Sequence, residues 1–138
     1  MGQWCCQKGN TLLIPCGTDP GQKHLFALLI SPVVVYGYGR LPMVLLANVT
    51  SVKNGVAGDD SCLLSKGEHP FITHDSFVDY RMARFERADF IATKVNNGDF
   101  IEKDPCSPEL IRKLIQGALA SRKIPREHKK ILNDVLFG

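Results

Sequence analysis

Apolar residues in this chain are grouped in short runs that turn-forming residues interrupt, and this pattern predicts a β-rich fold. The clearest run extends from Met43 to Val49 and ends in the hydroxyl pair Thr50 and Ser51. A continuous apolar run of this length, closed by polar residues, is typical of a buried strand. We therefore expect a strand over residues 43–51 that delivers hydroxyl groups to the rim of a sheet.

Several other segments up to about Ile101 have the same character. Further strands are expected over residues 11–15, 24–30, 61–65, 77–85 and 88–94, with glycine- and proline-rich turns between them. Within 77–85, the residues Val78, Tyr80 and Met82 fall on one face, which suits a strand with one side buried. Closely spaced short strands with such turns indicate a small barrel or sandwich.

The C-terminal part changes to helical spacing. Ser107 is expected to cap a helix with Pro108 as its first residue, and that helix should end near Ser121. Pro125 then opens a second helix. The two apolar stripes are Leu110, Ile111, Leu114, Ile115 and Ala118 in the first helix, and Ile131, Leu132, Val135 and Leu136 in the second. We expect the stripes to pack against the barrel, with one of them or a strand edge meeting a second copy in a homodimer.

The composition is that of a globular protein with a single domain. The chain has 138 residues, of which 44% are hydrophobic and 22% charged, and we divide it into a barrel over about 8–101 and a helical tail over about 107–137. No apolar run reaches the roughly 18 residues that a membrane span needs. The N-terminus lacks the features of a secretory signal. We therefore expect a cytoplasmic protein with no membrane contact.

Cysteine and histidine spacing gives no sign of a metal or cofactor. The five cysteines are odd in number and include the adjacent pair Cys5 and Cys6, which argues against a disulfide framework and favours a reducing compartment. There is no CxxC motif, and no histidine pair has zinc-ligand spacing. His69, His74 and Cys62 are the nearest approach to a ligand set, and we expect no metal and no cofactor. A net charge of +3 permits a phosphate-bearing partner without requiring one.

The order of several short motifs resembles that of the PemK/MazF-type toxins. These motifs are Gly9–Pro15, the glycines at 17 and 21, Arg40-Leu41-Pro42, Val49-Thr50-Ser51 and a helix after Lys103-Asp104-Pro105. The similarity covers roughly Lys8 to Ser121, and it rests on the order of the motifs because no single one is highly specific. It implies an SH3-like β-barrel that is usually a homodimer, cuts single-stranded RNA and is bound by a cognate antitoxin protein.

Candidate site residues follow from the chemistry that such cleavage needs. Attack of the ribose 2′-hydroxyl on the adjacent phosphorus requires a base, a proton donor and a cation for the phosphate. His24 can act as base or acid near neutral pH, and Asp79 can be a base or can orient the histidine. Arg81 can bind the phosphate through two hydrogen bonds. The expected substrate contacts are Thr50, Ser51 and Lys53, with Tyr80, Tyr36 and Tyr38 as stacking platforms for bases.

Each candidate also has a structural explanation. Thr50 and Ser51 are positioned to bond their own turn. Asp79 and Arg81, two apart on one strand, share a face and can form a simple surface ion pair, which would turn Tyr80 into the core. The stretch 76–83 also lacks the Arg-Thr pair that is usual in the toxin family. Two hypotheses therefore stand: a metal-independent endoribonuclease toxin, and a non-catalytic SH3-like module that binds a protein or nucleic acid.

Overall fold

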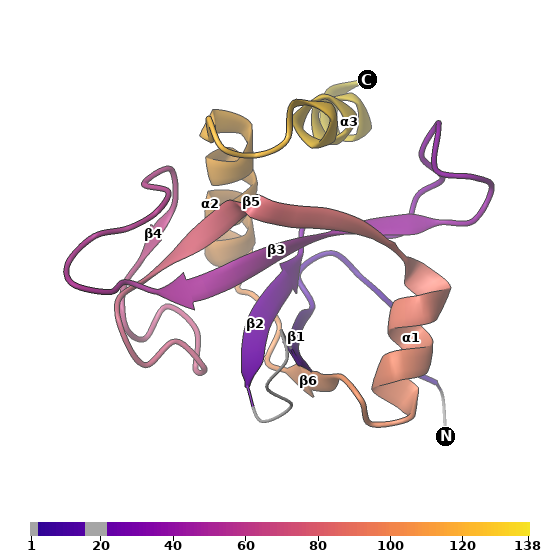
Figure 1. The fold of residues 1–138 in the computed structure, drawn as a ribbon. Coiled ribbons are helices and arrows are strands. Elements are labelled where there is room, and N and C mark those ends of the chain that lie inside the picture. The colour runs from indigo at the N-terminus through magenta and orange to yellow at the C-terminus, as the bar shows by residue number, and fades with distance from the viewer. Residues whose placement is uncertain (1–2, 16–21) are drawn as a thin grey trace.

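A computed structural model describes residues 3–15 and 22–138, so Cys16, Gly17 and Gly21 lie outside the described residues. It contains a curled antiparallel sheet and three helices (Figure 1). The strands are β1 (Thr11–Pro15), β2 (Lys23–Leu28), β3 (Met43–Ser51), β4 (Leu63–Leu64), β5 (Ser76–Arg87) and β6 (Ile101–Lys103). The helices are α1 (Ala88–Asn96), α2 (Pro108–Ala120) and α3 (Arg126–Phe137).

The strand order in the sheet is β4-β5-β3-β2-β1-β6. The long strands β3 and β5 cross the molecule side by side, and β2 and β1 turn away from them so that the sheet curls (Figure 1). The β-rich fold with C-terminal helices is confirmed, and β1 and β3 have the predicted bounds. The finer assignment to an SH3-like barrel stays a prediction.

Both faces of the sheet are covered, which explains why β3 is continuously apolar. Leu45, Ala47 and Val49 belong to a core that includes residues of α2 and α3. Val44 and Leu46 belong to a second core with Ile91 of α1. We call these sides the α2–α3 face and the α1 face. Because successive side chains alternate between the faces, the face of any residue in a regular strand follows from its neighbours.

Helices α2 and α3 form as the sequence predicts and share one core. The Ser107 hydroxyl accepts a hydrogen bond from the Leu110 amide at 3.1 Å, and Pro108 is the first helical residue. Leu114 and Leu132 are both buried in the core of the α2–α3 face. Most of both apolar stripes therefore packs on the same chain, although Ile111, Ile115, Ile131 and Leu136 are only partly buried and Val135 is exposed.

The strand predicted over 88–94 is wrong, because this segment is the helix α1. The β-branched residues Ile91, Thr93 and Val95 lie at every second position, which is the spacing expected for one face of a strand. Helical spacing instead places Ala88, Ile91 and Val95 on one side, where they pack against the α1 face of the sheet. The helix ends at Asn96 with Asn97 as its cap, and the following Gly98 has a φ of +89°, which suits the residue after a helix C-terminus.

The predicted face of β5 is correct only in its first half. Val78 and Tyr80 are buried, but Met82 is 54% exposed. The pairing with β3 shifts here, from Asn48 opposite Asp79 to Leu46 opposite Arg84. This bulge changes which residues point inward, so Ala83 and Phe85 enter the core in place of Met82.

Candidate functional site

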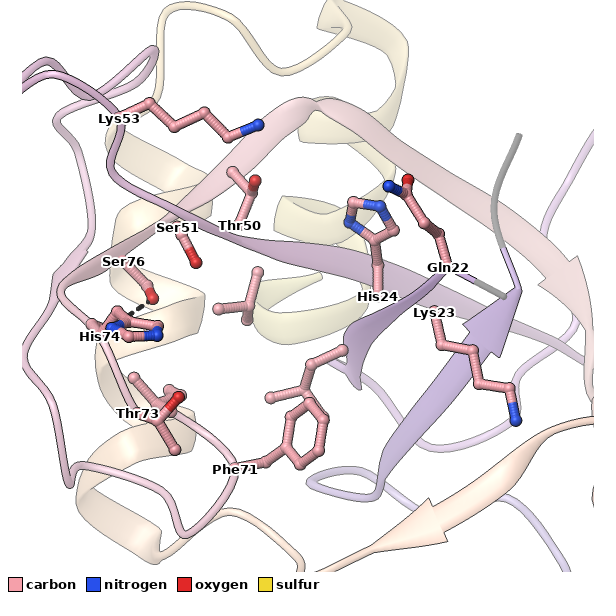
Figure 2. Close-up of a pocket in the computed structure, with 13 residues that line it drawn as sticks. Gln22, Lys23, His24, Thr50, Ser51, Lys53, Phe71, Thr73, His74 and Ser76 are labelled. Atoms are coloured by element: carbon pink, nitrogen blue, oxygen red, sulfur yellow. Dashed lines mark hydrogen bonds between the residues drawn. The ribbon is translucent and has the colours of Figure 1, made fainter. Parts of the chain in front are cut away.

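A groove of about 460 Å³ lies where β2 begins and β3 ends. Two lysines and two histidines line it together with hydroxyl and apolar residues (Figure 2). The lining residues are Gln22, Lys23, His24, Leu25, Val49, Thr50, Ser51, Lys53, Phe71, Ile72, Thr73, His74 and Ser76. None of these described lining residues is an Asp or Glu, so their side chains give the groove a basic character.

Strand pairing brings the polar ends of β2 and β3 together. Leu25 pairs with Val49, and continuation of this antiparallel register sets His24 beside Thr50 and Lys23 beside Ser51. Figure 2 shows His24 and Thr50 pointing to one side of the strands, while Lys23 and Ser51 point to the other. The end of β3 therefore places the hydroxyls of Thr50 and Ser51 at the rim, as predicted. The adjacent start of β2 places Lys23 and His24 beside them.

Lys53 is held by a tight turn that follows β3. Asn54 and Gly55 both have positive φ, at 57° and 70°. The Val56 amide donates to the Lys53 carbonyl oxygen at 3.1 Å. An Asn-Gly pair is the preferred sequence for a two-residue turn with positive φ at both positions. This turn reverses the chain just after β3 ends at Ser51 and holds Lys53 at the groove.

The opposite wall of the groove, residues 71–76, is anchored by the buried imidazole of His69. The Phe71 amide donates to Nδ1 of His69 at 3.0 Å, so Nδ1 must be unprotonated. Nε2 then carries the ring proton and donates to the Asp104 carbonyl oxygen at 2.5 Å. His69 is thus a neutral structural residue that ties this wall to the segment after β6.

His74 sits on this wall, and sequence reasoning did not include it among the site residues. The Val52 amide donates to the Asp75 carbonyl oxygen at 2.9 Å, which holds the wall against the end of β3. Within the described part of the chain, no hydrogen bond reaches the imidazole of His24 or of His74. Nothing local in the sequence joins these two histidines, which line the same groove from separate segments.

The predicted site residues separate into two groups. His24, Thr50, Ser51 and Lys53 all line the groove. Asp79 and Arg81 do not, and they form an ion pair of 3.3 Å with each other. The Arg81 side chain is 71% exposed and that of Asp79 is 14% exposed. The structure therefore does not bring the predicted arginine to the groove that holds the predicted histidine.

Tyr80 is a core residue, and its assignment as a stacking platform is wrong. The side chain has no exposed surface, and its hydroxyl donates to the Leu114 carbonyl oxygen at 2.6 Å. Burial is the main cause that raises the pKa of the Tyr80 phenol, so it stays protonated and keeps this bond. Tyr36 is fully exposed and Tyr38 packs against Phe85, and neither lines the groove.

Across residues 3–15 and 22–138, no three side chains of His, Cys, Asp or Glu converge to form a metal site. No helix in the same residues has the length and apolar character needed to cross a membrane. Comparison with family models, curated proteins and solved structures finds no match for this chain. The resemblance to PemK/MazF-type toxins therefore stays a prediction.

Proposed function

We propose that the groove binds single-stranded RNA and that the protein cleaves it as a metal-independent endoribonuclease. The observation that carries this proposal is that His24, His74, Lys23 and Lys53 all line one groove. Lysine side chains attract the phosphates of a nucleic acid backbone. Imidazoles can give and take protons at neutral pH. The groove thus offers every group that cleavage through the 2′-hydroxyl requires.

The two histidines supply the proton transfers. One imidazole accepts the proton of the 2′-hydroxyl while its oxygen forms a bond to the adjacent phosphorus. The other, in its protonated form, donates a proton to the 5′-oxygen as the bond from phosphorus to that oxygen breaks. A lysine stabilises the negative charge on the phosphate during the transfer. The products are a 2′,3′-cyclic phosphate and a 5′-hydroxyl end.

Phe71, in place of Tyr80, is the aromatic residue that we propose as the stacking platform for a base. Its side chain is 43% exposed and lines the groove, so its ring can stack on a base. The Lys103 ammonium lies 5.5 Å from the centre of this ring. The platform therefore carries a cation next to an aromatic surface, a combination that suits single-stranded nucleic acid.

The toxin role and its partners rest on the resemblance to the PemK/MazF family. The basic, carboxylate-free character of the described groove lining supports an acidic antitoxin segment as the protein that would occupy it. A homodimer and an SH3-like barrel are further predictions of the same resemblance.

A non-catalytic module that binds nucleic acid is the second candidate. It is favoured by the position of Arg81, which forms an ion pair with Asp79 outside the groove. The groove then contains no arginine among its described lining residues to hold the scissile phosphate through two hydrogen bonds. Such a protein would bind RNA in the same place and leave it intact.

Incubation of the purified protein with end-labelled single-stranded RNA separates the two candidates. With EDTA present, we expect fragments that end in a 2′,3′-cyclic phosphate, identified by mass spectrometry. An all-deoxy oligonucleotide of the same sequence should bind and stay intact, because it lacks the attacking hydroxyl. Binding without cleavage would favour the non-catalytic module, and the absence of binding would overturn both proposals. Cleavage lost with EDTA and restored by Mg²⁺ would contradict the metal-independent mechanism.

A further inference from the structure

A cleft of about 430 Å³ lies where α2 meets the C-terminal end of α3. We call it the helical cleft. Its described lining shares no residue with the groove proposed to bind RNA. The apolar side chains that line it are those of Ile111, Ile115, Leu119, Leu136 and Phe137. A ligand in this cleft would therefore be additional to the RNA of the proposed function.

Helix α2 carries more apolar surface than its packing on the sheet requires. Its buried face, which belongs to the core, consists of Leu110, Leu114 and Ala118. An adjoining face is only partly buried and consists, at intervals of four residues, of Ile111, Ile115 and Leu119. Residues at this spacing lie above one another on one side of a helix. One stripe is enough to hold a helix on a sheet, so the second stripe leaves apolar surface in the cleft.

Phe137 adds an aromatic ring to this lining. It is 73% exposed, the most of any phenylalanine in the described residues. Aromatic residues are enriched where proteins bind one another, because one ring buries a large apolar area. The stripe from Ile111 to Leu119 rises by about 12 Å, at about 1.5 Å per residue. This length is that of about two helical turns, and it suits the apolar face of one amphipathic helix.

The charged groups of the helical cleft are all positive. Lys8 and Arg112 line it and are exposed, and its described lining contains no Asp or Glu. Neither Lys8 nor Arg112 forms an ion pair within the described part of the chain, and this holds also for Arg112 with Glu109 of the same helix. An acidic partner therefore gains attraction from both cations and meets no repelling carboxylate in the lining.

A second cleft, between residues 33–36 and α3, differs in charge. It is equally large, at about 430 Å³, and its lining includes Glu127, Lys130 and Asp134. Acids and a cation are mixed there, so neither sign of partner is favoured. The helical cleft, in contrast, combines an apolar lining with a single sign of charge.

We propose that the helical cleft docks an amphipathic helix of another protein. The docked helix places apolar side chains at i, i+4 and i+7 against the stripe of α2 and against Phe137, and acidic side chains beside Lys8 and Arg112. A second copy of this chain fits less well. In a two-fold contact the cleft meets itself, and the cations of both copies then lie in one interface.

Selection of helical peptides tests this proposal. A phage-displayed library of random peptides of about 16 residues, roughly 24 Å as a helix, is selected on the immobilised full chain. The enriched peptide is synthesised with a fluorescent label, and anisotropy measures its affinity. We expect apolar residues at i, i+4 and i+7, flanked by Asp or Glu. A library that yields no binder, or binders flanked by Lys and Arg, would overturn the proposal.

Two variants locate the bound peptide. Phe137→Ala should weaken its affinity at least about tenfold, the scale of an aromatic anchor. Arg112→Glu should also weaken it, with a larger effect at low salt, and a peptide with Lys in place of its acids should regain affinity for this variant. The matched controls Tyr36→Ala and Arg122→Glu change an exposed aromatic residue and an exposed arginine outside the cleft, so the affinity should stay the same.

Both variants should unfold at the same urea concentration as the wild type, because both residues are exposed. A peptide affinity that is unchanged in Phe137→Ala and in Arg112→Glu would place the peptide elsewhere and overturn the proposal. Self-association of the free protein that Phe137→Ala abolishes, measured by light scattering, would assign the cleft to a second copy and overturn it as well.

Discussion

Two polar regions of this molecule differ in how far their polar groups are bonded to the chain itself. The first, which we call the Asp59 clamp, joins the loop before β4 to the end of α2. Asp59 is only 5% exposed. It accepts hydrogen bonds from the Ser61 amide at 3.0 Å, from the Ser61 hydroxyl at 2.6 Å and from the Ser121 hydroxyl at 2.7 Å. The carboxylate is therefore fully engaged with its own chain.

The second region is the groove, whose polar groups are far less engaged. His24 and His74 have imidazoles that no hydrogen bond reaches within the described residues, and Asn48, nearby on the α1 face, has a buried oxygen without a partner. A satisfied polar network holds a fold together, whereas polar groups left without partners reduce stability. Groups of the second kind are thus the better indicators of a ligand site. The following predictions test this distinction, from the largest expected effect to the smallest.

His24→Ala and His74→Ala should each reduce the rate of RNA cleavage by about 10² to 10⁴-fold, the usual contribution of a general acid or base. Both side chains are at least partly exposed, so the free energy of unfolding should change by no more than about 0.5 kcal/mol. Single-turnover cleavage assays and urea unfolding measure the two effects. A variant that cleaves at the wild-type rate would remove that histidine from the mechanism.

Asp59→Asn should show the opposite pattern. Loss of charge-assisted hydrogen bonds in a buried network should lower the free energy of unfolding by about 2 kcal/mol. The affinity for single-stranded RNA, measured well below the unfolding temperature, should stay the same because the clamp is not part of the groove. A weaker RNA complex with unchanged stability would contradict the separation of the two regions.

The clamp also predicts how stability depends on pH. Burial by itself would raise the pKa of Asp59, but hydrogen bonds from Ser61 and Ser121 hold it below its usual value. The unfolded chain therefore takes up a proton before the folded one does. The stabilisation is present above about pH 4 and is lost as the pH falls through the lowered pKa. In urea unfolding between about pH 2 and about pH 6, the free energy of unfolding should fall less steeply with decreasing pH in Asp59→Asn than in the wild type.

Lys53→Ala should have a modest effect on RNA binding. Removal of one phosphate contact should reduce the slope of log affinity against log salt by about 0.7 for a single strand. Lys130→Ala is the matched control, because Lys130 is an exposed lysine of α3 outside the groove. Titrations at several salt concentrations measure both variants, and an equal change in the two would indicate a general charge effect.

Arg81→Lys should have the smallest effect. From sequence alone Arg81 was a candidate for the phosphate clamp, and its replacement would then reduce cleavage strongly. Its position outside the groove and its exposed ion pair with Asp79 instead predict cleavage within about twofold of wild type, since such pairs contribute little. A large loss of cleavage activity in Arg81→Lys would instead support a catalytic role for Arg81.

Sequence reasoning was most successful where a local pattern is sufficient to determine structure. The bounds of β1 and β3 were predicted correctly, and so were the cap at Ser107 and the start of α3 after Pro125. These features depend on neighbours in the chain. The predicted residues His24, Thr50, Ser51 and Lys53 also line one groove, but this depends on the pairing of β2 with β3, and their role in a site stays a prediction.

The sequence by itself determined the β-rich order of elements, the helical tail and the polar end of β3, because each is encoded by the spacing of adjacent residues. Only the tertiary structure decided that 88–94 is a helix, that the bulge in β5 exposes Met82 and turns Ala83 inward, and that His74 and His24 line one groove. The alternation of Ile91, Thr93 and Val95 fits a strand as well as a helix, and the apolar surface of the sheet selects the helix. The two histidines are 50 positions apart in the sequence, so only the pairing of β2 with β3 and the buried anchor at His69 bring them to one groove.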